Sequence, residues 1–206
     1  MIGFLQKDIR LLKSSSGIIF LLFILLGVGY SIYLGFIGIF IAVLGYLGII
    51  FANKLFYLDR KEEFEVFAFT TPKGIKGYLK GKLLLFYLLD LMIGILSFGA
   101  LLKMGAFFSI ALKAALIGTS FFLIIHMIIS LIYIIFGDKG NAIVGLLVIA
   151  MIFPGSRFFG KYISNSFPSL FSFNLDKMTI LFLTTTIILT GIVYFGGYHI
   201  YKSKDF

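Results

Sequence analysis

Residues 54–82 read KLFYLDRKEEFEVFAFTTPKGIKGYLKGK and form the one long charged stretch in a chain that is otherwise almost entirely apolar. They hold 11 of the 27 charged residues, and apolar runs precede and follow them. Over the whole chain 60% of residues are hydrophobic and 13% are charged, against roughly 45–50% and roughly 25% in ordinary globular domains. We therefore expect an all-α integral membrane protein, with this stretch inserted between two membrane helices.

Six stretches outside the insert approach the length of about 20 apolar residues that a helix needs to cross the hydrocarbon core. They lie at about 17–33, 36–51, 83–102, within 107–136, at 142–159 and at 178–198. The run 107–136 is too long for one straight crossing, so we expect its beginning, with Lys113, to be interfacial or tilted. At 206 residues the chain has room for a single transmembrane domain, residues 1–206.

Basic residues predict the orientation, because cytoplasmic loops of membrane proteins carry an excess of Lys and Arg. With the N-terminus inside, 13 of the 18 Lys and Arg residues fall on the cytoplasmic side and both termini are cytoplasmic. The formal charge of +9 then needs no nucleic acid partner. The basic N-terminal flank lacks a small-residue cleavage site, so we expect an uncleaved first span.

Three segments are expected not to span the membrane. Residues 1–16 form an interfacial helix, because apolar residues repeat at helical spacing through Ile2, Leu5, Ile9 and Leu12, with polar residues opposite. The second segment is the insert 54–82. The third is the extracellular loop 154–177, which is apolar for a loop and is expected to be partly re-entrant, with protein or a wet cavity covering its backbone.

Residue patterns for chemistry are sparse. The chain has no cysteine, and its two histidines, His126 and His199, lie on different predicted spans, so we expect no metal site. The adjacent Glu62 and Glu63 do not share a helix face, which favours a solvated surface over a catalytic pair. No catalytic motif is present, and we predict no catalytic residues in this chain.

The sequence around Gly81-Lys82 superficially resembles a phosphate-binding loop, but it fails in detail. Lys76 stands where the first glycine should be, and Leu83 stands where Ser or Thr should hold magnesium. No apolar strand leads into it. We therefore expect this chain to bind no nucleotide.

Two ionisable residues lie inside predicted spans, where they are default functional candidates. Asp90 is about eight residues into the third span, and His126 is near the middle of the fourth. They either line a polar pathway or make interhelical hydrogen bonds, with Asp90 reaching toward Lys82 or a neighbour. Neither has an obvious partner in the sequence, and we favour the packing role.

The insert itself predicts a helix–turn–helix elbow. Residues 59–69 favour a helix in which Glu62, Glu63 and Glu65 face water while Phe64, Phe67 and Ala68 share another face. Thr71-Pro72 ends this helix, because the residue before proline is pushed out of the helical region. A second, basic helix begins at about Ile75 and leads through Lys82 into the third span. Such an elbow, projecting below the membrane, suits a groove on a partner protein.

Two groups of residues carry a resemblance to a known family. One is the Lys-Asp pair in the N-terminal MIGFLQKDIRLLKSSSG; the other comprises Phe56, Asp59, Glu65 and Phe69, the turn Thr70-Thr71-Pro72, and Gly81-Lys82, with Lys82 ten residues after Pro72. On these residues the chain resembles the ABC-2 type membrane subunits of ATP-binding-cassette transporters, in particular short stand-alone permeases of low-GC bacteria. Thr71 and Gly74 depart from the family pattern, which usually has Leu and a Ser-like residue there.

The resemblance implies a permease subunit in a bacterial plasma membrane. Two such subunits, identical or different, pair in the bilayer, and separate ABC ATPase subunits dock on the elbows. ATP and Mg²⁺ belong to those ATPases, so this chain is no enzyme by itself and holds no cofactor. The residues expected to couple the elbow to the ATPase are Asp59, Glu62, Glu65, Phe69, Thr71, Pro72, Lys73, Gly81 and Lys82.

The cargo and the class of transporter stay open at this point. The apolar spans favour export of an amphipathic or hydrophobic substrate, such as an antimicrobial or toxin peptide, a drug or a lipid. The alternatives are the substrate-capture (S-type) subunit of a vitamin uptake transporter, which would need a polar binding cup, and an immunity membrane protein that binds a peptide without pumping it. An intramembrane enzyme would need paired acids or a His cluster within the spans, and the sequence shows none.

Overall fold

The computed structural model describes residues 7–8, 26, 48, 50, 52–59, 64–71, 74–147 and 175–203. Within them the elements are α4 (Phe64–Phe69), α5 (Gly74–Lys103), α6 (Phe108–Phe136), the 3₁₀ turn η1 (Gly137–Lys139), α8 (Leu175–Gly191), the π-helical η2 (Ile192–Gly196) and α9 (Gly197–Lys202). Residues 52–59 and 140–147 are also helical. The described part of the chain contains no strand, which confirms the expected all-α class.

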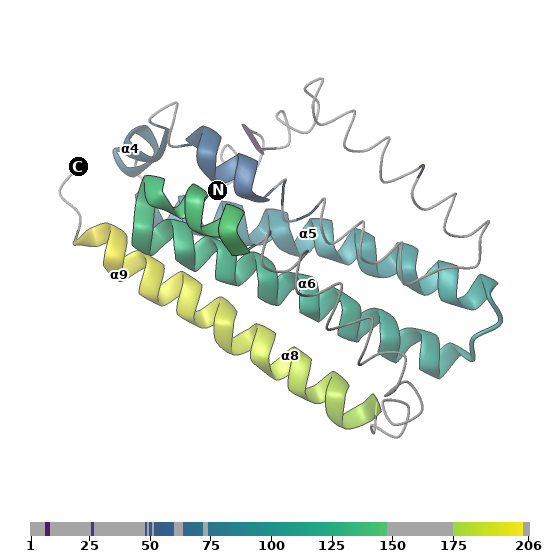
Figure 1. Cartoon of the computed structure of the whole chain (residues 1–206). Coiled ribbons are helices and arrows are strands. Elements are labelled where there is room, and N and C mark those ends of the chain that lie inside the picture. Colours follow the sequence, from purple (N-terminus) through teal and green to yellow (C-terminus); the bar gives the residue numbers. More distant parts are fainter. Residues whose placement is uncertain are drawn as a thin grey trace.

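Among the described residues, three helical stretches are long and apolar enough to cross a membrane: Gly74–Lys103, Phe108–Leu147 and Leu175–Lys202. They contain the third, fourth and sixth expected spans. Figure 1 shows α5, α6 and α8 side by side, with α9 continuing α8. The count of six stays a prediction, because most of the first, second and fifth spans and of the interfacial helix falls outside the described residues. Residues 154–174 of the expected loop also fall outside them, whereas residues 175–177, expected in that loop, are the first turn of α8.

Two glycines with positive φ reverse the chain between neighbouring helices. Gly105, at φ +84°, follows α5, and Ala106 N–H donates to Leu101 O while Gly105 N–H donates to Leu102 O. This is a Schellman turn, which favours glycine because a Cβ would be strained there. Gly137, at φ +62° and ψ −130°, follows the last residue of α6, and its N–H donates to Tyr133 O.

The reversal at Gly137 separates residues 140–147 from α6. A Cβ built on Gly140 would lie 3.3 Å from Tyr133 Cα, whereas seven residues of straight helix would separate them by about 10 Å. The stretch Phe108–Leu147 is therefore a helix followed by a hairpin turn, as the expected division between the fourth and fifth spans requires. Asn53 Nδ2 donates to Asn141 Oδ1 at 2.9 Å, and the Tyr133 hydroxyl donates to Asn53, so this turn is tied to residues 52–59.

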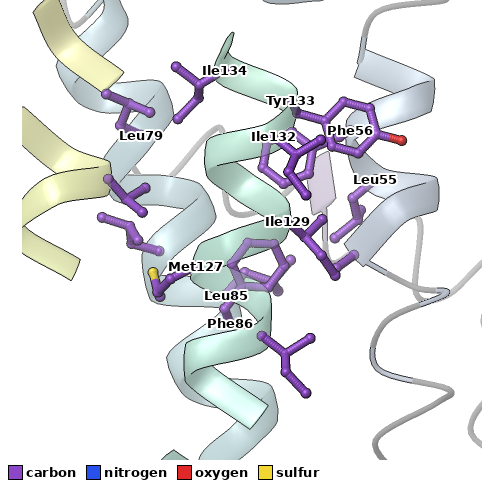
Figure 2. Packing of buried hydrophobic residues seen from close by; sticks show 14 of the residues in the cluster. Leu55, Phe56, Leu79, Leu85, Phe86, Met127, Ile129, Ile132, Tyr133 and Ile134 are labelled. Carbon is purple, nitrogen blue, oxygen red and sulfur yellow. The ribbon is translucent and has the colours of Figure 1, made fainter. Parts of the chain in front are cut away.

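The core lies where residues 52–59 pack against α5 and α6. Figure 2 shows Leu55 and Phe56 facing Ile129, Ile132 and Tyr133 of α6. The Phe56 and Tyr133 rings are stacked, with centroids 4.9 Å apart. Gly94 brings α5 close to α6, because any Cβ there would overlap Thr119 Oγ1. Small residues at such crossings let membrane helices approach closely.

The last span contributes little to this core. Only 11% of its most apolar window is buried, and several large side chains are exposed along it: Ile180, Leu181, Ile187, Ile188, Ile192 and Phe195. An ion pair of 2.6 Å between Lys113 Nζ and Asp176 Oδ1 joins the beginnings of α6 and α8, so these two helices run in the same direction. A surface of this kind suits lipid or another membrane chain rather than water.

Candidate functional site

A buried ionic cluster occupies the end of the bundle where α5 begins and α9 ends. Lys82 Nζ lies 3.0 Å from Asp8 Oδ1 and 2.7 Å from Asp59 Oδ2. Lys7 pairs with the same two carboxylates. Asp8, Asp59 and Lys82 are all almost fully buried, where an uncompensated charge would be costly. Each of these charges has an opposite charge at hydrogen-bond distance.

Two tyrosines extend the cluster to the elbow and to the last span. The Tyr78 hydroxyl lies 3.0 Å from Asp59 Oδ2 and 3.1 Å from Glu65 Oε1, and the Tyr201 hydroxyl lies 3.2 Å from the same Glu65 oxygen. Glu65 thus accepts hydrogen bonds from Tyr78 of α5 and from Tyr201 of α9. We use the name ionic cluster for these seven residues: Lys7, Asp8, Asp59, Glu65, Tyr78, Lys82 and Tyr201.

Aromatic packing seals the cluster from one side. The Phe69 ring contacts the rings of Tyr78 and Tyr201, with centroids 5.6 and 4.8 Å away. Lys7 Nζ stands 3.8 Å from the centroid of the Phe64 ring. Excluding water in this way strengthens the ionic contacts, because the effective dielectric constant falls.

The elbow turn is fixed by hydrogen bonds of Thr71. Its hydroxyl donates to Ala68 O at 2.7 Å and accepts from Gly74 N–H at 3.2 Å, while its carbonyl accepts from Gly74 N–H at 2.8 Å. Threonine hydroxyls that bond nearby main-chain groups in this manner stabilise turns. The expected helix from about Ile75 into the third span is confirmed, because α5 runs without a break from Gly74 to Lys103.

The expected faces of the first elbow helix are wrong at two positions. Glu65 was expected to face water, but it is 4% exposed, because the two tyrosine hydroxyls hold it inside the ionic cluster. Phe67 was expected to share a face with Ala68, but it is 64% exposed while Ala68 is fully buried. Val66 beside it is 42% exposed. The elbow therefore turns its acid inward and presents apolar side chains outward.

The structure brings together several of the residues predicted to couple the elbow to a partner. Asp59, Glu65, Phe69 and Lys82 meet in or against the ionic cluster, Gly81 is buried beside Lys82 on α5, and Thr71 forms the turn. Glu62, Pro72 and Lys73 lie outside the described residues.

Sequence reasoning missed Lys7, Asp8, Tyr78 and Tyr201 as members of the ionic cluster. Asp8 is part of the Lys-Asp pair on which the family resemblance rests, so the pair carried a usable signal. Tyr78 and Tyr201 lie among the 11 tyrosines of the chain, and nothing in their spacing distinguishes them.

Asp90 and His126 are partners of each other. His126 Nδ1 lies 2.8 Å from Asp90 Oδ2, and both side chains are buried between α5 and α6. The expectation that neither has an obvious partner is wrong, and Asp90 does not reach Lys82, which is bound to Asp8 and Asp59. The Phe86 ring stacks on His126 with centroids 4.9 Å apart, and Gly48 leaves room for the imidazole on another side. This contact joins α5 to α6, as the favoured packing role predicts.

The comparisons with known proteins decide the family. A family model described as "ABC-2 family transporter protein" matches residues 3–202. The chain belongs to the ABC-2 transporter family. No curated protein and no solved structure matches it significantly.

The match to the ABC-2 family covers the whole ionic cluster. The matched region runs from the N-terminal segment to the last helix, so all contributors to the ionic cluster, from Lys7 to Tyr201, lie within it. The chain is accordingly a membrane component of a transporter and not its catalytic subunit. In the residues that the structure describes, no cluster of His, Cys, Asp or Glu has the arrangement of a metal site.

Proposed function

We propose that this ABC-2 family chain is the permease subunit of an ATP-driven exporter, energised by separate ABC ATPase subunits that dock on the elbow. Two permease subunits, identical or different, surround the cargo path in a bacterial plasma membrane, with both termini on the cytoplasmic side. The family match supports the permease assignment, and the apolar helices support the membrane location.

One observation supports the docking site most directly. Val66 and Phe67 are exposed on α4, and the residues on either side of them, Glu65 and Ala68, are buried and fixed. In Figure 1, α4 lies at the end of the helical bundle where α9 also lies, and Tyr201 of α9 contacts Glu65 and Phe69 of α4. An exposed apolar pair on a rigid support is typical of a protein–protein contact.

Burial favours two separate roles, one for buried members of the predicted coupling set and one for exposed residues beside them that were not in that set. Asp59, Glu65 and Lys82 are buried, so they transmit movement of the elbow to α5 and the last span without touching the ATPase. Val66, Phe67 and the exposed Thr70 are available for the contact itself. Glu62, Pro72 and Lys73 stay predicted members of the docking surface.

The proposed cargo is an amphipathic or hydrophobic molecule, such as an antimicrobial or toxin peptide, with drugs and lipids as further classes. The scarcity of ionisable residues within the spans supports this choice, because polar cargo would need polar groups along its path. Inside the described spans, Asp90 and His126 are joined to each other by one hydrogen bond between α5 and α6, through Asp90 Oδ2.

The test is co-purification of the tagged chain with an ABC ATPase encoded beside it. Replacing Phe67 by aspartate should reduce recovery of the ATPase about tenfold or more, because an exposed apolar anchor contributes about 2 kcal/mol or more when it is a central contact. Phe107→Asp is the matched control: Phe107 is also exposed, but it lies in the turn between α5 and α6 at the opposite end of the bundle.

Equal recovery with wild type and Phe67→Asp would refute the docking site. Failure of the wild-type chain to bind any ATPase would refute the exporter and favour the alternatives. Tight retention of a vitamin by the purified chain would then indicate an S-type subunit, and peptide binding without ATPase would indicate an immunity protein.

A further inference from the structure

Two lysines and two tyrosines form a polar strip where α5 packs against the last span. Lys76 and Lys80 are exposed on α5, four residues apart and therefore on one face. Lys76 Nζ lies 5.1 Å from the ring centroid of Tyr198 in α9, and Lys80 Nζ lies 5.7 Å from that of Tyr194 in η2. We call these four side chains the lysine–tyrosine strip.

The strip is rich in hydrogen-bond donors and contains no carboxylate of its own. Among the described residues, neither ammonium group pairs with a carboxylate, and neither the Tyr194 nor the Tyr198 hydroxyl has a hydrogen-bond partner. Among the described residues, the acids that contact this end of α5 are Asp8, Asp59 and Glu65, and all three are held inside the ionic cluster. Like charges at this spacing repel each other, so the two lysines together attract an anion.

The height of the strip matches a lipid headgroup. The apolar run of α5 begins at Leu83, so Lys80 lies about 4.5 Å and Lys76 about 10 Å below it along the helix axis. The headgroup layer on each side of a bilayer is about 5–7 Å thick, so Lys80 lies within it, and Lys76 lies just beyond it, where its long flexible side chain still reaches the headgroups. Tyrosine is also enriched at this level, because its ring is apolar and its hydroxyl is polar.

Apolar surface lies next to the donors. Ile192 and Phe195 flank Tyr194 on the last span, and both are exposed. An acyl chain could lie on these side chains while its phosphate meets the lysines. A free phosphate ion would use only the donors, and a zwitterionic headgroup would bring a second positive charge close to two uncompensated ammonium groups.

We propose that the lysine–tyrosine strip binds the phosphate of an anionic phospholipid. Lys76 and Lys80 bracket the phosphate, the hydroxyls of Tyr194 and Tyr198 donate to its oxygens, and an acyl chain covers Ile192 and Phe195. Because the strip joins α5 to the last span, the bound lipid also holds these two helices together. This binding requires no ATPase and does not depend on the direction of transport.

Native mass spectrometry of the detergent-purified chain tests the proposal, with dioleoylphosphatidylglycerol, dioleoylphosphatidylcholine and inorganic phosphate added in separate titrations. Phosphatidylglycerol should bind in preference to phosphatidylcholine. Lys76→Gln with Lys80→Gln should weaken it about 30-fold, since each lysine near an anionic headgroup contributes about a fivefold factor. The matched control is Lys54→Gln with Lys139→Gln, which removes the same charge from two other exposed lysines and should change the affinity less than about threefold.

A further double variant tests the tyrosine hydroxyls without changing the charge of the strip. Tyr194→Phe with Tyr198→Phe retains both rings and removes only the hydroxyls, so it should weaken binding by a smaller but measurable factor. Circular dichroism melting verifies that each variant is folded.

Three results would overturn the assignment. Equal losses in the two lysine double variants would show that net charge, and not the strip, holds the lipid. Equal binding of phosphatidylcholine and phosphatidylglycerol would show that the charge of the headgroup does not determine binding. Saturation of the site by inorganic phosphate alone would assign it to a soluble anion.

Discussion

Replacing Lys82 by methionine tests whether the ionic cluster holds the elbow to the membrane helices. The substitution keeps much of the side-chain length and removes the ammonium group that lies 3.0 Å from Asp8 Oδ1 and 2.7 Å from Asp59 Oδ2. Both carboxylates then stay buried with only Lys7 to compensate them. Breaking a buried ion pair on one side costs about 3–5 kcal/mol, and the remaining contacts of Lys7 favour the lower end of this range.

A loss of about 3 kcal/mol corresponds to a fall in Tm of about 6–12 °C for a chain of this size. Because the chain contains no tryptophan, unfolding in detergent is best followed by circular dichroism at the helical band. Lys103→Met is the matched control, since Lys103 lies on the same helix but is exposed at its other end, and its Tm should stay close to wild type.

A rescue variant separates charge from packing. In Lys82→Met with Asp8→Asn, one of the two stranded carboxylates becomes neutral, so at least half of the lost stability should return. If Lys82→Met melts no lower than Lys103→Met, or if the Asp8→Asn rescue lowers the Tm further, the cluster does not stabilise the elbow as the structure indicates.

Two further predictions concern the contact between α5 and α6. A double-mutant cycle of Asp90→Leu and His126→Phe should give a coupling of about 0.6–1.7 kcal/mol in thermal unfolding, the range of interhelical hydrogen bonds in membranes, and additive effects would contradict the pair. Gly94→Ala should destabilise the chain by about 1–3 kcal/mol through overlap with Thr119 Oγ1, and Thr119→Ala should restore most of the loss. Gly99→Ala serves as the control, because nothing lies within 4 Å of a Cβ at that position, and a Tm change as large as that of Gly94→Ala would refute the overlap.

The class of the protein and its elbow could be predicted from the sequence because both depend on local patterns. A long apolar run with few charges predicts a membrane helix, and this led to α5, α6 and the last span. Thr71-Pro72 predicted the elbow turn, and the uninterrupted pattern from Ile75 predicted that the basic helix continues into the third span. The Lys-Asp pair and the Pro72-to-Lys82 spacing were enough to suggest the ABC-2 family that the family comparison then established.

The ionic cluster could not be predicted in full because its members are far apart in the sequence. Glu65 and Tyr201 are 136 residues apart, and Lys82 and Asp8 are 74 apart. Helical periodicity placed Glu65 on a solvated face, because periodicity identifies which residues share a face but not which face a neighbouring helix covers. The same limitation hid the pairing of Asp90 with His126, which lie on different helices.

The sequence by itself determined that this chain is a helical membrane protein with a charged elbow before its third span, because hydropathy and turn chemistry act over a few residues. Only the tertiary structure decided which charges are inside and which apolar side chains are outside. Burying Glu65 requires two tyrosine hydroxyls from distant helices. Phe67 is then exposed, because residues two positions apart on a helix point to different sides. The elbow is therefore held by its buried charges, while its apolar residues Val66 and Phe67 are exposed.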